Sequence, residues 1–365
     1  MITSKKIKVL VVDDSAVVRK MISDALAKDP QIEVVGTAPD PYIAREKILE
    51  LKPDVLTLDI EMPRMDGLTF LKILQQHRPI PVIIISSLTQ SGSAAALEAL
   101  QSGAVEILAK PSSAYSIGML GDQLAQCVKA AAGARVPRRV NAAPPTPNSQ
   151  LPSSISAVWH PRQLTVIGAS TGGVEALTEV LTHLPDGLPG IAIVQHIPPY
   201  FSRVFAERVN QQSAIEVREA AEGDLLRPGL ALIAPGDFHL TLGWTGSAYR
   251  VSLNQNSPVH HCRPSVDVLF RSVAESRGAR VVAAVLTGMG SDGALGMKAL
   301  KAIGARTLAQ DEATSVVYGM PRAAAELGVV DRVLPLPQIA SALVEAARSV
   351  AADSAHPSPE TSLTH

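Results

Sequence analysis

Three side chains that together support acyl transfer follow three separate apolar runs of the sequence. The runs and the polar residues after them are Leu164–Ile167 with Ser170, Ile191–Val194 with His196, and Val281–Leu286 with Asp292. A serine is a weak nucleophile unless a base accepts its proton and a carboxylate orients that base. Short apolar runs of this kind predict buried parallel strands, whose C-terminal ends meet at one edge of a sheet. We therefore expect a Ser–His–Asp site at that edge.

The glycines around Ser170 allow a second interpretation. The segment Gly168-Ala-Ser-Thr-Gly-Gly173 would also suit a dinucleotide pyrophosphate at a helix N-terminus. However, the next apolar run ends in Gln195 and His196 instead of an acidic residue that would hold a ribose hydroxyl. The chain also has no Tyr-x-x-x-Lys pair. Both observations favour the hydrolytic interpretation.

A second set of polar residues follows the apolar runs nearer the N-terminus. The set comprises Asp13, Asp14, Asp59, Ser86 and Lys110. In a parallel sheet of order 2-1-3-4-5, the first and third strands are neighbours, so the three carboxylates converge. Unpaired carboxylates repel one another unless a cation neutralises them, and their hard oxygen atoms suit Mg²⁺. The hydroxyl and the ammonium would then face phosphoryl oxygens.

Length and composition restrict the class of protein. The 365 residues suffice for two or three domains, and 46% apolar with 18% charged residues suits α/β cores. A formal net charge of −1 gives no indication of a nucleic-acid partner. The two cysteines, Cys127 and Cys262, are too far apart to suggest a disulfide framework, and His260-His261-Cys262 lacks a second pair of metal ligands. With neither a secretory leader nor a stretch of ~20 apolar residues, we expect a cytoplasmic protein without membrane insertion.

Strand and helix patterns divide the chain into two modules. Residues 1–132 alternate five strands with helices, the strands being Ile7–Val12, Ile32–Thr37, Val55–Leu58, Val82–Ser86 and Val105–Ala109. Residues 133–162 are rich in proline and small polar residues and predict a flexible linker. Residues 163–351 predict a doubly wound, mostly parallel α/β domain. Three short runs would form a small antiparallel excursion, namely Ala231–Ala234, His239–Leu242 and Tyr249–Leu253. Residues 352–365 predict a disordered tail.

The first module resembles a two-component receiver domain with the flavodoxin-like fold. The matching segments are Val11-Val-Asp-Asp-Ser15, Leu58-Asp-Ile-Glu-Met-Pro63, Met65-Asp-Gly67, Ser86-Ser87 and Lys110-Pro111. The resemblance implies Asp59 as phosphoacceptor, with Asp13, Asp14 and Asp59 as Mg²⁺ ligands. It also implies Ser86 as the switch hydroxyl and Lys110 as the phosphate partner. Ile107 stands where receivers often have a rotating aromatic residue, so an aromatic swing is not expected.

The second module resembles the catalytic domain of the chemotaxis protein-glutamate methylesterase (CheB) family. The matching segments include Ile167-Gly-Ala-Ser-Thr-Gly-Gly173, Val194-Gln-His-Ile-Pro198, Arg263-Pro-Ser-Val-Asp267 and Leu286-Thr-Gly-Met-Gly-Ser-Asp-Gly293. The resemblance implies Ser170 as nucleophile, His196 as general base and acid, and Asp292 as orienting carboxylate. Thr171 and Met289 would support the site and the oxyanion.

The same resemblance implies an activity and its partners. Glutamate methyl esters, and glutamine amides, of methyl-accepting chemotaxis receptors would be the substrates, and a chemotaxis histidine kinase the phosphodonor. Ester hydrolysis itself would need no cofactor. Two alternatives remain: hydrolysis of another protein ester or amide, and a non-catalytic signalling adaptor. A DNA-binding response regulator would need a compact basic output domain of about a hundred residues, whereas the output module here is nearly twice that length, rich in strands and near neutral.

Overall fold

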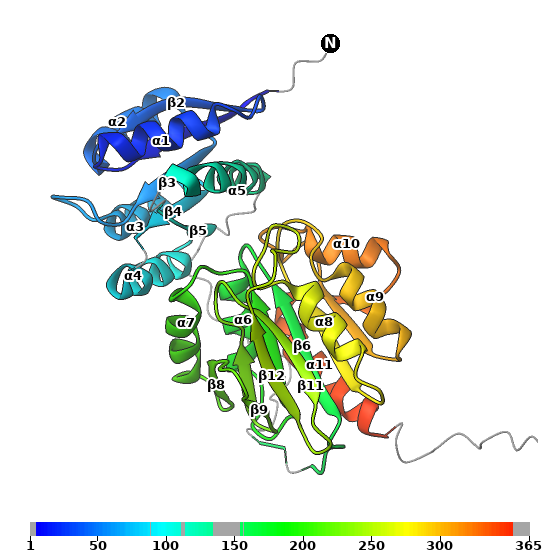
Figure 1. Cartoon of the computed structure of the whole chain (residues 1–365). Coiled ribbons are helices and arrows are strands. Elements are labelled where there is room, and N and C mark those ends of the chain that lie inside the picture. Colours follow the sequence, from blue (N-terminus) through cyan, green and yellow to red (C-terminus); the bar gives the residue numbers. More distant parts are fainter. Residues whose placement is uncertain (1–4, 88, 111–113, 134–153, 156, 353–365) are drawn as a thin grey trace, which may run out of the picture.

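Two α/β domains in contact make up the part of the chain that the computed structural model describes, residues 5–87, 89–110, 114–133, 154–155 and 157–352 (Figure 1). The N-terminal domain runs from β1 to α5, and the C-terminal domain from β6 to α11. Residues 134–153, 156 and 353–365, which include most of the expected linker and nearly all of the expected tail, lie outside the described residues. Within the described ranges, no helix is long and apolar enough to cross a membrane.

The N-terminal sheet has five parallel strands in the order β2-β1-β3-β4-β5, as predicted. The strands are β1 (Ile7–Val12), β2 (Ile32–Ala38), β3 (Val55–Asp59), β4 (Val82–Ser86) and β5 (Glu106–Ala109). The helices are α1 (Ala16–Leu26), α2 (Pro41–Leu51), α3 (Gly67–His77), α4 (Gln90–Gln101) and α5 (Ala114–Gly133). Every residue of β3 and β4 is buried, which is expected of mostly apolar strands that are covered on both faces.

The C-terminal domain is built on seven parallel strands in the order β15-β14-β13-β6-β7-β10-β8. These strands are β6 (Gln163–Ala169), β7 (Ile191–Gln195), β8 (Glu216–Glu219), β10 (Leu230–Ile233), β13 (Arg280–Val285), β14 (Arg306–Gln310) and β15 (Arg332–Leu334). The helices are α6 (Gly173–Thr182), α7 (Phe201–Asn210), α8 (Val266–Ala274), α9 (Ala294–Ala302), α10 (Met320–Glu326) and α11 (Leu336–Ala352). Strands β7, β8 and β10 lie on one side of β6, and β13, β14 and β15 lie on the other side. The strand order therefore reverses between β6 and β13.

A small antiparallel sheet accompanies the large one, but one of the strands predicted for it lies elsewhere. It consists of β9 (Leu225–Leu226), β11 (His239–Trp244) and β12 (Tyr249–Asn254). The run predicted at Ala231–Ala234 instead forms β10, which pairs in parallel with β7 and β8 in the central sheet. All four residues of β10 are buried, as a central parallel strand requires; the absence of a helix before it made it resemble an excursion.

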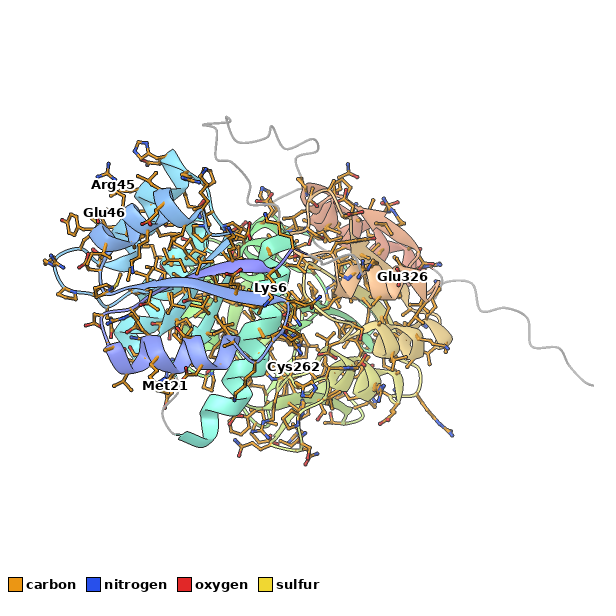
Figure 2. The ribbon with its side chains drawn as sticks, turned by 90° about the horizontal axis from the view of Figure 1, so that it is seen from above. Lys6, Met21, Arg45, Glu46, Cys262 and Glu326 are labelled. Carbon is orange, nitrogen blue, oxygen red and sulfur yellow. The ribbon has the colours of Figure 1, made fainter. Side chains whose placement is uncertain are left out.

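The N-terminal domain packs on the C-terminal domain through its α4 and β5 side. Helix α4 contacts α6 and α7, and Arg208 of α7 donates a hydrogen bond to Gln101 of α4. Val316 of the C-terminal domain packs against the hydrophobic cluster that includes Cys127 and Val128 of α5. Seen from above, Arg45 and Glu46 of α2 lie on the far side of the molecule from Glu326 of α10 (Figure 2). The face that carries α2 is therefore directed away from the domain contact.

Candidate active site

Ser170 lies in the turn between β6 and α6, beside the point at which the strand order reverses. Its backbone N–H donates to the carbonyl of Thr287, which follows β13, at 3.0 Å. Gly172 has a φ of 76°, in the left-handed region that favours glycine. A Cβ on Gly173 would collide with the side chain of Gln195. The glycines therefore permit the tight turn that brings the serine to the sheet edge, where open parallel sheets form their sites.

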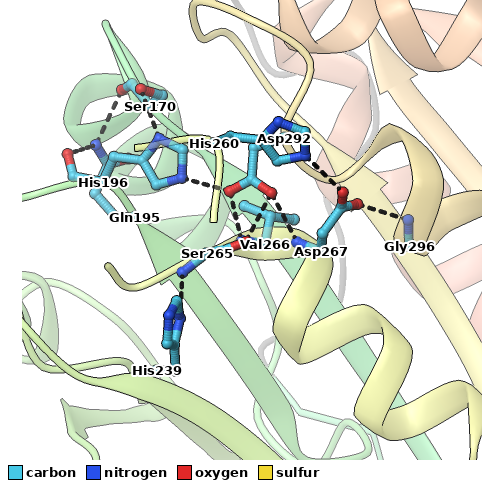
Figure 3. Close-up of polar contacts among 10 residues, drawn as sticks. All are labelled: Ser170, Gln195, His196, His239, His260, Ser265, Val266, Asp267, Asp292 and Gly296. Carbon is cyan, nitrogen blue, oxygen red and sulfur yellow. Dashed lines mark hydrogen bonds and ion pairs between the residues drawn. The ribbon is translucent and has the colours of Figure 1, made fainter. Parts of the chain in front are cut away.

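His196 connects Ser170 to Asp292. It follows β7 directly, and its Nδ1 lies 3.1 Å from the Ser170 Oγ while its Nε2 lies 2.8 Å from the Asp292 Oδ2 (Figure 3). With the proton on Nε2, Nδ1 is free to accept the proton of the serine. The three residues predicted from the sequence to act together thus lie in one hydrogen-bonded row.

The N-terminus of α8 holds the carboxylate of Asp292. Oδ1 accepts from the Ser265 hydroxyl at 2.8 Å and from the Asp267 N–H at 2.9 Å, and Oδ2 accepts from the Val266 N–H at 2.8 Å. Burial alone would raise the pKa of Asp292, but His196 and these helix N–H groups lower it to about 2. The carboxylate is therefore ionised throughout the physiological pH range.

The environment of His196 favours its protonated form. Burial alone would lower its pKa, but Cys262 and the Asp292 carboxylate act in the opposite direction, and the net effect raises it. A base that is stabilised when protonated can store the serine proton during an acyl transfer. Gln195 supports this arrangement because its Nε2 donates to the carbonyls of both Ser170 and His196, at 2.9 and 3.0 Å.

Two backbone N–H groups near Ser170 have no partner among the described residues, namely those of Thr171 and Met289. Gly288 places Met289 close to the serine, because a Cβ on Gly288 would lie 2.7 Å from the Cβ of Ser170. Unpaired N–H groups beside a nucleophile are suited to bind the oxygen of a tetrahedral intermediate. The side chain of Thr171 points to the other domain and donates from Oγ1 to Oε2 of Glu106 on β5, at 2.6 Å.

His260, Asp267 and Asp292 have ligand atoms within 4.8 Å of one another, a spacing that also suits a metal ion. The described contacts, however, already occupy these atoms. His260 Nε2 lies 3.0 Å from Asp267 Oδ2, and Asp267 Oδ1 accepts from the Gly296 N–H at 2.6 Å (Figure 3). Both oxygens of Asp292 also have hydrogen-bond partners, so the cluster is a hydrogen-bonded network that supports the active site.

The N-terminal domain brings its predicted carboxylates together at the C-terminal edge of its sheet. Val12 pairs with Leu58, so Asp13 lies beside Asp59, and oxygens of Asp13, Asp14 and Asp59 lie within 4.8 Å of one another. Lys110, after β5, places its Nζ 3.1 Å from Asp13 and 2.8 Å from Asp59. Ser86 is buried at the end of β4, the strand next to β3. Pro111 lies outside the described residues.

The donor set of this acidic cluster fits a hard divalent cation. Oδ2 of Asp13 and Oδ2 of Asp59 are buried and accept no aligned hydrogen bond from the described residues, although Lys110 lies close to both. Burial raises the pKa of Asp59, and Lys110 only partly opposes this. For Lys110, burial would lower the pKa, but Asp59 and Asp13 outweigh it and raise the pKa. Underbonded carboxylate oxygens at one point are what Mg²⁺ binding requires.

Comparison with known proteins agrees with these two sites. The CheB methylesterase family matches residues 165–343, and the response regulator receiver domain family matches residues 9–118. A protein from Syntrophus aciditrophicus named protein-glutamate methylesterase/protein-glutamine glutaminase 2 is 52% identical, over 93% of this chain and 98% of its own. Relatives of the same type from Anaeromyxobacter dehalogenans and Pseudomonas aeruginosa are 50% and 49% identical, over 94% and 93% of this chain and 96% and 97% of theirs. The resemblances inferred from the sequence are thereby confirmed, and the chain belongs to the protein-glutamate methylesterase/protein-glutamine glutaminase family, with a receiver domain followed by a CheB methylesterase domain.

Proposed function

We propose that this protein is a phosphorylation-controlled hydrolase that converts glutamate methyl esters of methyl-accepting chemotaxis receptors to glutamate, and glutamine side chains to glutamate. The observation that carries the proposal is the Ser170–His196–Asp292 row, with contacts of 3.1 and 2.8 Å. The names of the relatives supply the substrate class.

In the proposed reaction the Ser170 Oγ attacks the ester carbonyl while its proton passes to Nδ1 of His196. Asp292 stabilises the imidazolium that forms, and the N–H groups of Thr171 and Met289 bind the oxyanion. Protonated His196 then returns the proton to the leaving methoxide, so methanol departs. Water hydrolyses the glutamyl-serine ester by the same steps in reverse order. An amide substrate would release ammonia.

Phosphorylation of Asp59 by a histidine kinase is the proposed control. Asp13, Asp14 and Asp59 would hold Mg²⁺, which would neutralise phosphoryl oxygens while the carboxylate attacks. Lys110 and Ser86 would then bind the phosphoryl group. Because α4 and β5 cover the side of the C-terminal domain that carries Ser170, weakening this contact would open the active site. A coupling of ~1–3 kcal/mol would change access about 5- to 150-fold.

The test is methanol release from methylated receptor membranes by the full-length protein. A small acyl phosphate with Mg²⁺ should accelerate the wild-type protein and leave Asp59→Asn at its basal rate. Ser170→Ala deletes a single oxygen at a turn, so it should fold normally and lose several orders of magnitude in rate. Near wild-type release by Ser170→Ala would refute the nucleophile assignment, whereas stimulation of Asp59→Asn would refute the control mechanism.

A further inference from the structure

A small cavity separates the receiver domain from the catalytic serine. Its volume is about 20 Å³, and its walls include Ala104 and Glu106 of the receiver and Ser170, Gly172, Gln195 and Val316 of the catalytic domain. A space of this size holds about one water molecule and no ester side chain. In this closed arrangement, the receiver therefore leaves no room for an acyl group on this side of Ser170.

Glu106 is the polar side chain among the receiver residues that line this cavity, beside Leu100 and Ala104. Its Oε2 accepts the Thr171 hydroxyl at 2.6 Å, and its Oε1 accepts the N–H of Ile107 at 3.0 Å. The buried aspartates of the receiver pair with a cation, Asp13 and Asp59 with Lys110 and Asp40 with Arg64. Glu106 has no lysine or arginine within ion-pair distance in the part of the chain that the structure describes.

The surroundings of Glu106 disfavour a negative charge on its side chain. Burial raises its pKa, and the hydrogen bonds from Thr171 and Ile107 and the nearby His196 only partly oppose this. Burial in the closed arrangement thus shifts the titration of Glu106 towards the neutral acid, and a glutamic acid side chain has the same acyl skeleton as a glutamyl ester or a glutamine amide. The group that binds this carboxyl oxygen is the hydroxyl of Thr171, the residue that follows the nucleophile.

We infer that Glu106 occupies the subsite for the substrate's glutamyl side chain as a built-in analogue of the reaction product, and that the Thr171 hydroxyl is the donor that recognises the side-chain carbonyl in both cases. This inference rests on the proposed function and names the group that the site recognises. Glu106 and the substrate glutamyl group would have equal chain length and compete for one hydroxyl. The inhibitory contact would thus imitate the chemistry of the substrate as well as block its path.

The first experiment measures how fast a serine-directed fluorophosphonate labels Ser170 in the unphosphorylated full-length protein. Glu106→Leu preserves side-chain size but leaves the buried Thr171 hydroxyl without an acceptor, so labelling should accelerate about tenfold or more. Glu106→Asp is one methylene too short to reach Thr171 and should behave similarly. Glu106→Gln keeps the carbonyl oxygen and should stay closed, with mass spectrometry used to confirm that the new amide has not been hydrolysed. Glu98→Leu, the same change at a half-exposed position of α4, serves as the control.

The pH dependence of labelling separates Glu106 from its neighbours. The pKa of Glu106 is higher in the closed form, so its contribution to closure is complete below its ordinary pKa and is lost as pH rises through the raised value. Glu175 of α6, His196 after β7 and Cys127 of α5 also lie around this carboxyl or its pocket. All three remain in Glu106→Gln. The rate of Ser170 labelling should therefore increase with pH more steeply in the wild-type protein than in Glu106→Gln.

The second experiment tests the shared use of Thr171 in the phosphorylated protein. Thr171→Val keeps its shape and backbone N–H but loses the hydroxyl, so KM for a peptide with a γ-methyl glutamate should rise about tenfold. Glu106→Leu should leave that KM unchanged, because the receiver no longer covers the site. In the unphosphorylated protein, Thr171→Val and Glu106→Leu together should open the site no further than either change alone.

Three results would overturn the inference. The first two are labelling of Ser170 at the wild-type rate in Glu106→Leu or in Glu106→Asp. The third is faster labelling of Ser170 in Thr171→Val without a rise in KM for the glutamyl ester peptide. The third result would show that the contact between Thr171 and Glu106 only holds the two domains together and lies outside the substrate subsite. A failure of Ser170 to label in the phosphorylated wild-type protein would refute the proposed function itself. If Ser170 is labelled normally in the phosphorylated protein but substitutions at Glu106 do not change the labelling rate, only this inference is refuted. Thermal melting of each variant confirms that it is folded.

Discussion

Asparagine at position 292 would disturb the active site in a way that can be followed atom by atom. The Asp292 Oδ1 accepts from the Ser265 hydroxyl and the Asp267 N–H, and Oδ2 accepts from His196 and the Val266 N–H. An asparagine must place its NH₂ group at one of these two positions. In either orientation that group faces a backbone N–H, which can only donate. One buried N–H of α8 therefore loses its acceptor in Asp292→Asn.

The expected losses follow from these contacts. An NH₂ group at the Oδ2 position would require His196 to accept on Nε2, which leaves Nδ1 protonated and unable to take the serine proton. We expect kcat to fall by about 10³–10⁴, less than for removal of the nucleophile. An unsatisfied N–H costs ~1–3 kcal/mol, so the melting temperature of the catalytic domain should fall by roughly 2–12 °C.

The same substitution should change the response to acid. The pKa of Asp292 is lowered to about 2 from its ordinary value of 3.8, so its ionised form stabilises the fold above about pH 4. That contribution, roughly 2–3 kcal/mol, is lost as pH falls towards 2. Asp292→Asn lacks it at every pH. The difference in unfolding free energy between wild-type and variant should therefore narrow between pH 5 and pH 2.

Methanol release and urea unfolding, each measured as a function of pH, would test this reasoning. Ser265→Ala is the matched control, because it removes one hydrogen bond to Asp292 Oδ1 and leaves the contact with His196. It should cost about 1 kcal/mol of stability and less than tenfold in rate. A rate for Asp292→Asn within tenfold of wild-type, or a stability difference independent of pH, would show that Asp292 neither orients His196 nor is held as an anion.

Three further predictions concern other parts of the molecule. His196→Ala should lower ester hydrolysis about as severely as Ser170→Ala with no loss of fold, as activity and circular dichroism would show; a mild loss of rate would contradict its role as base. A radiolabelled acyl phosphate should label Asp59 only with Mg²⁺, and label that persists in Asp59→Asn or in EDTA would count against the acidic cluster as the phosphorylation site. Gly173→Val should destabilise the catalytic domain by several kcal/mol, because its Cβ would collide with Gln195 and approach the Cβ of Ala169 to 2.8 Å; an unchanged melting temperature would refute this packing argument.

Most of the parallel strands could be predicted from the sequence because they are buried on both faces and are therefore mostly apolar. The run at Val82–Ser86, for example, matches β4 at both ends. β10 was assigned to the wrong sheet because strands β8 to β10 follow one another without a helix, and the run itself does not say with which neighbour it pairs. The two-residue β9 is too short to leave any periodic signal.

The members of the active site could be predicted because each follows an apolar run, but their supports could not. Ser265 and the N–H groups of α8 hold Asp292 through contacts across 25 to 27 residues of sequence, which no local pattern reveals. Glu106 lies 65 residues before its partner Thr171 and in the other domain. Its only signal in the sequence is a charged residue at the start of an otherwise apolar strand, Glu106–Ala109. The roles assigned to these residues remain predictions.

Strand β5 connects the Thr171 contact to the acidic cluster around Asp59, the two sites that the proposed phosphorylation would have to couple. Glu106 begins the strand, and Lys110, whose ammonium lies beside Asp59, follows its last residue, so about 13 Å of extended backbone separates the Cα atoms of these two residues. Ile107, buried between them, has no ring that could change its orientation. A displacement of Lys110 towards a phosphoryl group would be carried along the main chain of one strand. The signal from the kinase would then be transmitted by a shift of the β5 backbone, without a series of side-chain rotamer changes.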